Sequence, residues 1–131
     1  PASIAAAVRA PDRRVLCVAG DGDFLMAAGE LATVTHEGCA PLFVVMDNGQ
    51  YGTIRMHQER DYPGRVVGTQ LKNPDFALYA KAFGGHGERV ERTEDFAPAF
   101  ERALASGKPA ILHCLVDQRA LSVGKDFVPQ A

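Results

Sequence analysis

Short apolar runs alternate along the chain with longer stretches in which apolar side chains recur every three or four residues. The apolar runs have the length of buried strands, and the periodic stretches indicate amphipathic helices. The predicted strands cover 15–19, 42–46, 87–90 and 110–116, and the predicted helices cover 3–10, 24–37, 53–60, 73–83 and a stretch that opens at 93. This alternation predicts an α/β fold with a parallel sheet flanked by helices.

The helix predicted over 24–37 joins the first two strands, and Phe24, Ala28, Leu31 and Thr35 share one of its faces at helical spacing. Two parallel strands joined by a helix bring their carboxyl ends side by side. Open α/β sheets bind ligands at this edge. We therefore expect the residues that follow the first and second strands to form one binding site.

Both strand ends carry polar, glycine-rich sequence. Gly20, Asp21 and Gly22 follow the first strand, and Asn48 lies just after the second. Glycine lets the backbone approach a ligand closely, and the N–H groups at the start of a helix favour phosphate. A carboxylate and a neutral oxygen brought together in this way suit Mg²⁺, which is completed by water and ligand phosphates.

This combination resembles the cofactor-binding signature of the thiamine diphosphate (ThDP) enzymes. In that signature Gly-Asp-Gly is followed by a spacer and a pair of asparagines, which correspond here to residues 23–46 and to Asp47 and Asn48. Glu-Leu-Ala-Thr at 30–33 and Asn-Gly-Gln-Tyr-Gly at 48–52 make the resemblance specific. It is most similar to the C-terminal, diphosphate-binding domain of the acetolactate synthase-like branch, and it implies that residues 1–131 form one such domain.

The resemblance implies a role for the residues at both strand ends. Mg²⁺ would be held by the carboxylate of Asp21, the side-chain oxygen of Asn48 and the backbone carbonyl of Gln50. The diphosphate would accept hydrogen bonds from the backbone N–H groups of Gly22 and Asp23. Residues after the metal loop would approach the thiazolium ring or the substrate. The expected cofactor-binding set is Gly20, Asp21, Gly22, Asp23, Asn48, Gln50, Tyr51, Gly52, Thr53 and Ile54.

Two aspartates depart from the family pattern. Many members have Ser or Ala at the position of Asp23. A carboxylate beside a diphosphate is unfavourable unless it turns away, and Asp23 could instead cap the helix. Asp47 replaces the first Asn of the usual pair, which orients the loop by hydrogen bonds. A carboxylate still accepts such bonds but has no amide donor, so one contact must differ.

The activity that the resemblance implies belongs to a larger enzyme, a 2-oxo acid-using lyase or transferase that decarboxylates and carboligates through a ThDP carbanion. The activating glutamate would come from a pyrimidine-binding domain of the same or a second subunit, so we assign no catalytic residue here and expect a homodimer or homotetramer. The chain begins at Pro1 inside a predicted helix, and we expect a fragment that is inactive alone. FAD binding by the parent enzyme is not inferable, because the family's middle domain lies outside this stretch.

Composition excludes several other classes of protein. A net charge of -2, with 47% hydrophobic and 23% charged residues, is typical of soluble globular proteins and gives no sign of nucleic acid or an anionic membrane as a partner. No apolar stretch is long enough to span a bilayer. The three cysteines are too few and too irregularly spaced to suggest a disulfide framework, and we expect a cytoplasmic protein.

Two alternatives to a ThDP enzyme remain open on the sequence. A haloacid dehalogenase-like phosphotransferase would use Asp21 and Asp23 as the Asp-x-Asp pair after an apolar strand, although the downstream lysines are poorly placed for it. A non-catalytic subunit would retain the fold without the chemistry, and the departures at Asp23 and Asp47 leave room for that interpretation.

Overall fold

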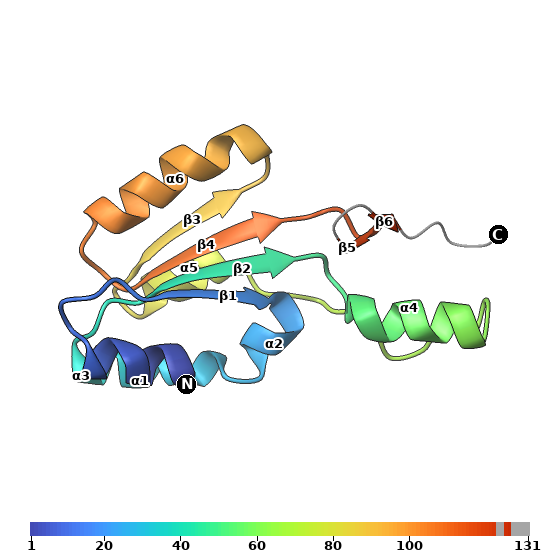
Figure 1. Ribbon diagram of the computed structural model, residues 1–131, viewed down its shortest axis with the longest axis horizontal. Coiled ribbons are helices and arrows are strands. Elements are labelled where there is room, and N and C mark those ends of the chain that lie inside the picture. Colours follow the sequence, from blue (N-terminus) through green and yellow to red (C-terminus); the bar gives the residue numbers. More distant parts are fainter. Residues whose placement is uncertain (123–124, 127–131) are drawn as a thin grey trace.

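The computed structural model describes residues 1–122 and 125–126, and its main sheet has four parallel strands (Figure 1). The strands are β1 (Leu16–Gly20), β2 (Leu42–Asp47), β3 (His86–Val90) and β4 (Ala110–Leu115), in the spatial order β1-β2-β4-β3. β1 and β2 are neighbours whose ends lie level, since Gly20 pairs with Met46. The predicted parallel α/β sheet is therefore confirmed, with its first two strands adjacent.

Helices cover the two faces of the sheet unequally. On one face lie α1 (Ala2–Arg9), α2 (Asp21–Leu25), α3 (Leu31–Glu37) and α5 (Phe76–Ala82), and on the other lies α6 (Thr93–Ala105). α4 (Gly52–Asp61) extends away from the sheet beyond the end of β2 (Figure 1). No residue of α4 is buried, so its position depends on the loops at its base and not on core packing.

The core has two halves because successive strand residues point to opposite faces. In β2, Phe43 and Val45 belong to the cluster under α1, α3 and α5, whereas Leu42 and Val44 belong to the cluster under α6. Among the described residues, Phe76 is the largest side chain that is fully buried. Its ring meets that of Phe24 edge to face at 5.4 Å between centroids, which ties α5 to α2 next to the ends of β1 and β2.

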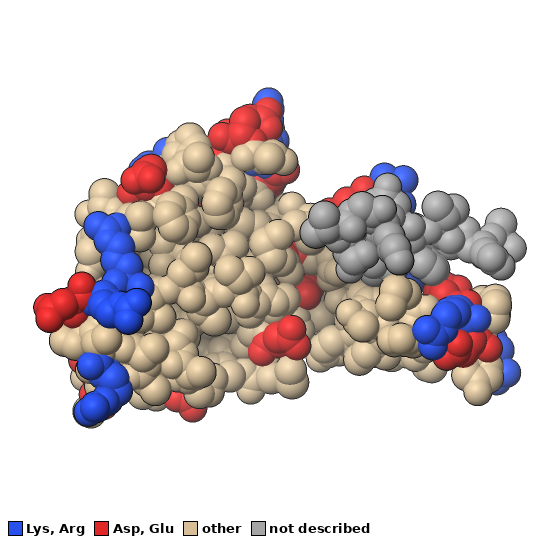
Figure 2. Space-filling model, viewed as in Figure 1, with Lys and Arg blue, Asp and Glu red and all other residues tan. Residues whose placement is uncertain are grey.

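The α6 face of the sheet is covered only in part. Leu16 and Val18 of β1 point to this face and are 53% and 65% exposed. Figure 2 shows few Lys, Arg, Asp or Glu side chains over the middle of the face that is turned to the viewer. α6 contacts β3 and β4, so β1 lies outside the area that it covers.

The prediction of one continuous helix over 24–37 was wrong. The structure has α2, then a 3-10 turn (η1, Ala28–Glu30), then α3, with a non-helical residue at Ala27 (φ −132°, ψ 18°). The buried face also differs at one position, because Val34 is fully buried whereas Thr35 is exposed and its hydroxyl donates to the carbonyl of Leu31. The bend allows α2 to stay at the end of β1 while α3 packs along the sheet.

The segment after β4 forms an antiparallel pair, β5 (Ala120–Ser122) with β6 (Lys125–Asp126), which the sequence did not predict. The rest of the tail, at 123–124 and 127–131, lies outside the described residues. Among the helices of residues 1–122 and 125–126, none has the length and apolar character needed to cross a bilayer.

Candidate functional site

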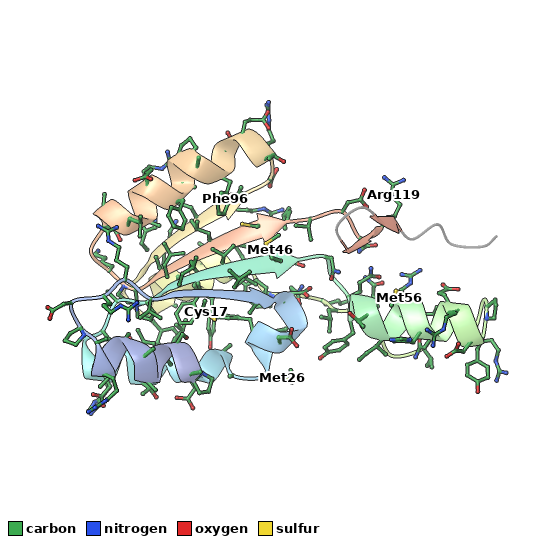
Figure 3. All side chains as sticks on the ribbon, in the orientation of Figure 1. Cys17, Met26, Met46, Met56, Phe96 and Arg119 are labelled. Atoms are coloured by element: carbon green, nitrogen blue, oxygen red, sulfur yellow. The ribbon has the colours of Figure 1, made fainter. Side chains whose placement is uncertain are left out.

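A cleft of about 410 Å³ lies at the edge of the sheet where β1 and β2 end. It brings together all ten residues that the sequence predicted as a cofactor-binding set, from both strand ends. Two further side chains that were not predicted also line it. These are Met46, at the carboxyl end of β2 (Figure 3), and Val116, just after β4. Both belong to apolar runs that the sequence predicted as strands, so they could not be separated from core residues by sequence.

The turn from β1 into α2 forms one wall of the cleft. Asp21 is only 3% exposed, and its Oδ1 accepts a hydrogen bond of 3.0 Å from the backbone N–H of Gly22. The ring of Tyr51 lies against Gly22, where an added Cβ would be 2.4 Å from Cε1 of the ring. Glycine is therefore required at position 22 for this close approach, as the Gly-Asp-Gly pattern implied.

The loop after β2 is joined directly to the end of β1. The backbone N–H of Gly49 donates to Oδ2 of Asp21 at 2.9 Å and to Oδ1 of Asp47 at 2.9 Å. Gly49 has a φ of +67°, which glycine adopts without strain. Oδ1 of Asn48 accepts from the backbone N–H of Gln50 at 3.1 Å. The strand ends that hold Asp21 and Asn48 thus lie side by side, as parallel pairing predicted.

A second segment braces this loop from outside the predicted motif. Residues 49–51 pair with residues 69–71 through two backbone hydrogen bonds of 2.8 Å. The N–H of Tyr51 donates to the carbonyl of Thr69, and the N–H of Leu71 donates to the carbonyl of Gly49. The side chain of Gln50 is buried and donates to the carbonyl of Gln118 at 2.6 Å. The sequence assigned significance only to the backbone of Gln50, so this side-chain role was missed.

Beneath the loop, a partly buried polar network links Asp21, Asp47, Asn73 and His113. The amide nitrogen of Asn73 donates to Oδ2 of Asp21 at 2.6 Å and to Oδ1 of Asp47 at 2.7 Å. His113, 2% exposed in the middle of β4, makes a 2.7 Å hydrogen bond to Oδ2 of Asp47. Sequence reasoning missed both Asn73 and His113. The one available signal was a histidine inside an otherwise apolar strand.

The two carboxyl groups of this network differ in how readily they hold a proton. Burial raises the pKa of Asp21 above its ordinary value, and the neighbouring Asp47 adds to the rise while the Asn73 hydrogen bond opposes it. Burial alone would also raise the pKa of Asp47, but hydrogen bonds from His113, Asn73 and its other neighbours outweigh this and leave it lowered. The surroundings therefore disfavour the charged form of Asp21 and favour that of Asp47, and a cation beside Asp21 would stabilise its charged form.

The charges lining the cleft restrict what can bind in it. Among the described residues that line it are Asp21 and Asp23 but no Lys, Arg or His. Asp23 is exposed, and α2 has no side-chain cap, so the carboxylate turns to solvent and does not cap the helix. A polyanion would be repelled here unless a cation lay between it and the carboxylates.

Within residues 1–122 and 125–126, no three His, Cys, Asp or Glu side chains are grouped to hold a metal. The three predicted ligands, one carboxylate, one amide oxygen and one carbonyl, would suit a cation that completes its coordination with water and ligand phosphates, as Mg²⁺ does.

Comparison with known proteins identifies the family. Residues 1–114 match the family described as thiamine pyrophosphate enzyme, C-terminal TPP binding domain. The chain belongs to this family. The haloacid dehalogenase-like alternative is therefore dropped, and the predicted ThDP-binding fold is confirmed for this TPP-binding domain.

Curated relatives place the TPP-binding domain near the acetolactate synthases. It is 36% identical over 119 residues to the acetolactate synthase isozyme 2 large subunit of Escherichia coli, covering 90% of this chain and 22% of that protein. It is 32% identical over 132 residues to the putative thiamine pyrophosphate-containing protein YdaP of Bacillus subtilis, covering 100% of this chain and 23% of that protein. The chain thus spans about a fifth of the length of these relatives.

A solved structure shows the same fold. The thiamine diphosphate-dependent 4-hydroxybenzoylformate decarboxylase of Rhodococcus jostii matches with a TM-score of 0.81 and 28% identity, over 89% of this chain and 22% of that one.

Proposed function

We propose that this domain holds the diphosphate of ThDP through Mg²⁺, as part of a larger acetolactate synthase-like enzyme that decarboxylates and joins small 2-oxo acids. The observation that carries the proposal is the cleft, in which Asp21 and the loop around Asn48 converge at the ends of two parallel strands. Membership of the TPP-binding family supports the identity of the cofactor.

The residues around the cleft fit the cofactor. The carboxylate of Asp21, the side-chain oxygen of Asn48 and the carbonyl of Gln50 would hold Mg²⁺. The N–H groups of Gly22 and Asp23, in the first turn of α2, have no backbone acceptor within their own helix and would face the diphosphate, the N–H of Gly22 on leaving Oδ1 of Asp21, to which it donates in this structure. Because no basic side chain is among the described lining residues, the metal must supply the positive charge, and ThDP binding should require it.

Bound ThDP supplies an electron sink for cleavage and formation of bonds next to a carbonyl carbon. The domain's own residues position it. Tyr51, Gly52, Thr53 and Ile54 line the cleft beyond the metal loop, and Met46 and Val116 add apolar surface on which a thiazolium ring can rest. Their contribution is orientation and exclusion of water, and proton transfer is left to groups outside this chain.

The complete enzyme requires parts that this chain does not contain. We propose that a pyrimidine-binding domain of the same or a second subunit closes the cleft and provides the activating glutamate, in a cytoplasmic homodimer or homotetramer. The relatives are several times longer than this chain, which leaves room for such domains.

Turnover by the full-length protein tests this proposal. Pyruvate and other small 2-oxo acids are supplied with ThDP and Mg²⁺, and release of CO₂ is measured for wild type, Asp21→Asn and Asp12→Asn. Asp12 is an exposed residue in the loop between α1 and β1, away from the cleft, and serves as the matched control. We expect turnover in wild type and Asp12→Asn only. A folded protein that binds ThDP but turns over no 2-oxo acid would contradict the enzymatic proposal and favour a non-catalytic subunit.

A further inference from the structure

Two carboxyl groups lie side by side under the metal loop, at the ends of β1 and β2. Asp21 and Asp47 both accept from the same backbone N–H, that of Gly49. Two carboxylates that share one donor, one buried and the other largely shielded from solvent, repel each other, and without a bridging donor they would turn apart. A metal site that uses Asp21 needs this side chain in one fixed orientation.

The amide of Asn73 lies between the two carboxylates and donates one hydrogen to each of them. The reverse orientation of the amide would set its oxygen against two carboxylate oxygens, so the surroundings determine which atom is the nitrogen. Oδ2 of Asp21 then accepts from both Gly49 and Asn73. Among the hydrogen bonds of the described residues, Oδ1 accepts only the one from Gly22, which leaves it the less saturated oxygen.

Asn73 is itself held on both sides along the chain. Two residues before it, the N–H of Leu71 donates to the carbonyl of Gly49 at 2.8 Å. Two residues after it, Asp75 caps α5 by accepting from the N–H of Leu78 at 2.9 Å. The asparagine therefore connects the start of a core helix to the metal loop and does not belong to a free surface loop.

We propose that Asn73 is a positioning residue for the metal site, whose amide holds Asp21 and Asp47 together and leaves Oδ1 of Asp21 as the oxygen that meets Mg²⁺. The inference rests on the proposed function of the cleft. It also accounts for the departure at Asp47, because the amide donor that position 47 lacks is supplied by Asn73, 26 residues further along the chain. His113 fixes the other oxygen of Asp47 and prevents that side chain from rotating.

An exchange of the two side chains tests this inference in the full-length protein. Affinity for ThDP in the presence of Mg²⁺ is measured by calorimetry for wild type, Asn73→Asp, Asp47→Asn and the double variant, and thermal unfolding of each is measured without cofactor. Asn73→Asp removes the donor and adds a third carboxylate, so we expect affinity to fall about 10- to 100-fold. The Asp47→Asn variant keeps an acceptor for the N–H of Gly49, so its affinity for ThDP should stay within about threefold of that of wild type.

The double variant is the decisive member of the set. The amide introduced at position 47 can donate to the carboxylate introduced at position 73, the number of carboxylates returns to that of wild type, and Gly49 keeps its bond to Asp21. Oδ2 of Asp21 still lacks the donor that Asn73 supplied, so part of the lost affinity, and not all of it, should return. A purely structural role for Asn73 predicts instead that the two substitutions add their losses. If Asn73→Asp does not fold, Asn73→Ser replaces it. A serine hydroxyl donates only one hydrogen, whereas the asparagine amide donates two. We therefore expect the affinity for ThDP to fall measurably, but by less than about 10-fold.

The outcomes separate this inference from the proposed function. If wild type binds ThDP and all variants bind equally well, or if the double variant is worse than Asn73→Asp, the positioning role is wrong while the cofactor site stands. If folded wild type binds no ThDP with Mg²⁺, both the site and the positioning role are overturned.

Discussion

Replacing Gly22 with Ala tests the close approach of Tyr51 to the first turn of α2. The added Cβ would lie 2.4 Å from Cε1 and 2.8 Å from Cδ1 of the Tyr51 ring, and 3.3 Å from Cδ1 of Leu71. Carbon atoms in contact prefer about 3.5 Å, so the ring must move by about 1 Å. The backbone of Tyr51 is fixed by its bond to Thr69, so the movement falls on the ring or on α2, and both line the cleft.

Overpacking of this kind costs about 1–3 kcal/mol. Because Tyr51 is only half-buried, we expect most of the cost to appear in cofactor binding, as a loss of about tenfold or more in affinity for ThDP with Mg²⁺. The assay is calorimetric titration of the full-length protein, with urea unfolding to measure the loss of stability separately. Gly29→Ala is the matched control, since a Cβ there meets nothing within 4 Å, and it should change neither quantity by more than about 0.5 kcal/mol.

A double-mutant cycle decides whether Tyr51 is the cause. In a Tyr51→Ala background the ring is absent. The loss in free energy of ThDP binding caused by Gly22→Ala should therefore be smaller by about 1–2 kcal/mol there than in wild type. The reasoning is refuted if Gly22→Ala costs the same in both backgrounds, or if it leaves ThDP affinity unchanged in wild type.

Three further substitutions address the fold around the cleft, each measured by urea unfolding. Phe76→Ala removes a fully buried ring that contacts two other aromatic rings, and should lower the free energy of unfolding by about 3–5 kcal/mol. Gly87→Ala places a Cβ 2.0 Å from the backbone oxygen of Ala77, which cannot move without shifting α5, and should cost about 3 kcal/mol. Asp75→Ala removes the N-cap of α5 and should cost about 1 kcal/mol at pH 7. The hydrogen bond to the N–H of Leu78 lowers the pKa of Asp75 in the folded state, so its contribution is complete above the unfolded pKa of about 3.9 and should fade as pH drops through the folded value.

Each of these expectations has an outcome that would contradict it. A loss below about 1 kcal/mol for Phe76→Ala, or one no larger than that for the exposed Leu78→Ala on the same helix, would mean that the ring is not a core element. If Gly87→Ala left the free energy of unfolding unchanged, α5 could not lie as close to β3 as it does in this structure. For Asp75→Ala, an equal loss at pH 7 and at pH 2 would show that the charge of the carboxylate makes no contribution to the cap.

The sequence was sufficient to locate the cleft, because its walls follow from local rules. Apolar runs marked the strands, glycines marked their ends, and parallel pairing brings two strand ends together whatever the details of the core. The resemblance to the ThDP signature then supplied the rest of the predicted set. The ten predicted residues that line the cleft are all contributed by these two strand ends and the start of α4. What each of them binds stays a prediction.

The parts that were missed depend on tertiary packing. His113 reaches Asp47 only because β4 lies next to β2 with His113 opposite Val45, a register that a single sequence does not reveal. Asn73 lies in a polar segment that reads as a helix start, and its partners are 52 and 26 residues away. The bend at Ala27 and the burial of Val34 in place of Thr35 were likewise missed, because helical spacing alone leaves both open.

Calorimetric titration of ThDP into the full-length protein tests the central claim most directly. Binding is measured with Mg²⁺ and with EDTA, for wild type, Asp21→Ala and the control Asp12→Ala. Because the cleft offers a carboxylate and no described basic side chain to a diphosphate, we predict saturable binding in wild type and Asp12→Ala with Mg²⁺, and none with EDTA or in Asp21→Ala. Undiminished affinity in EDTA, or in a folded Asp21→Ala variant, would contradict the assignment of this cleft as a Mg²⁺-diphosphate site.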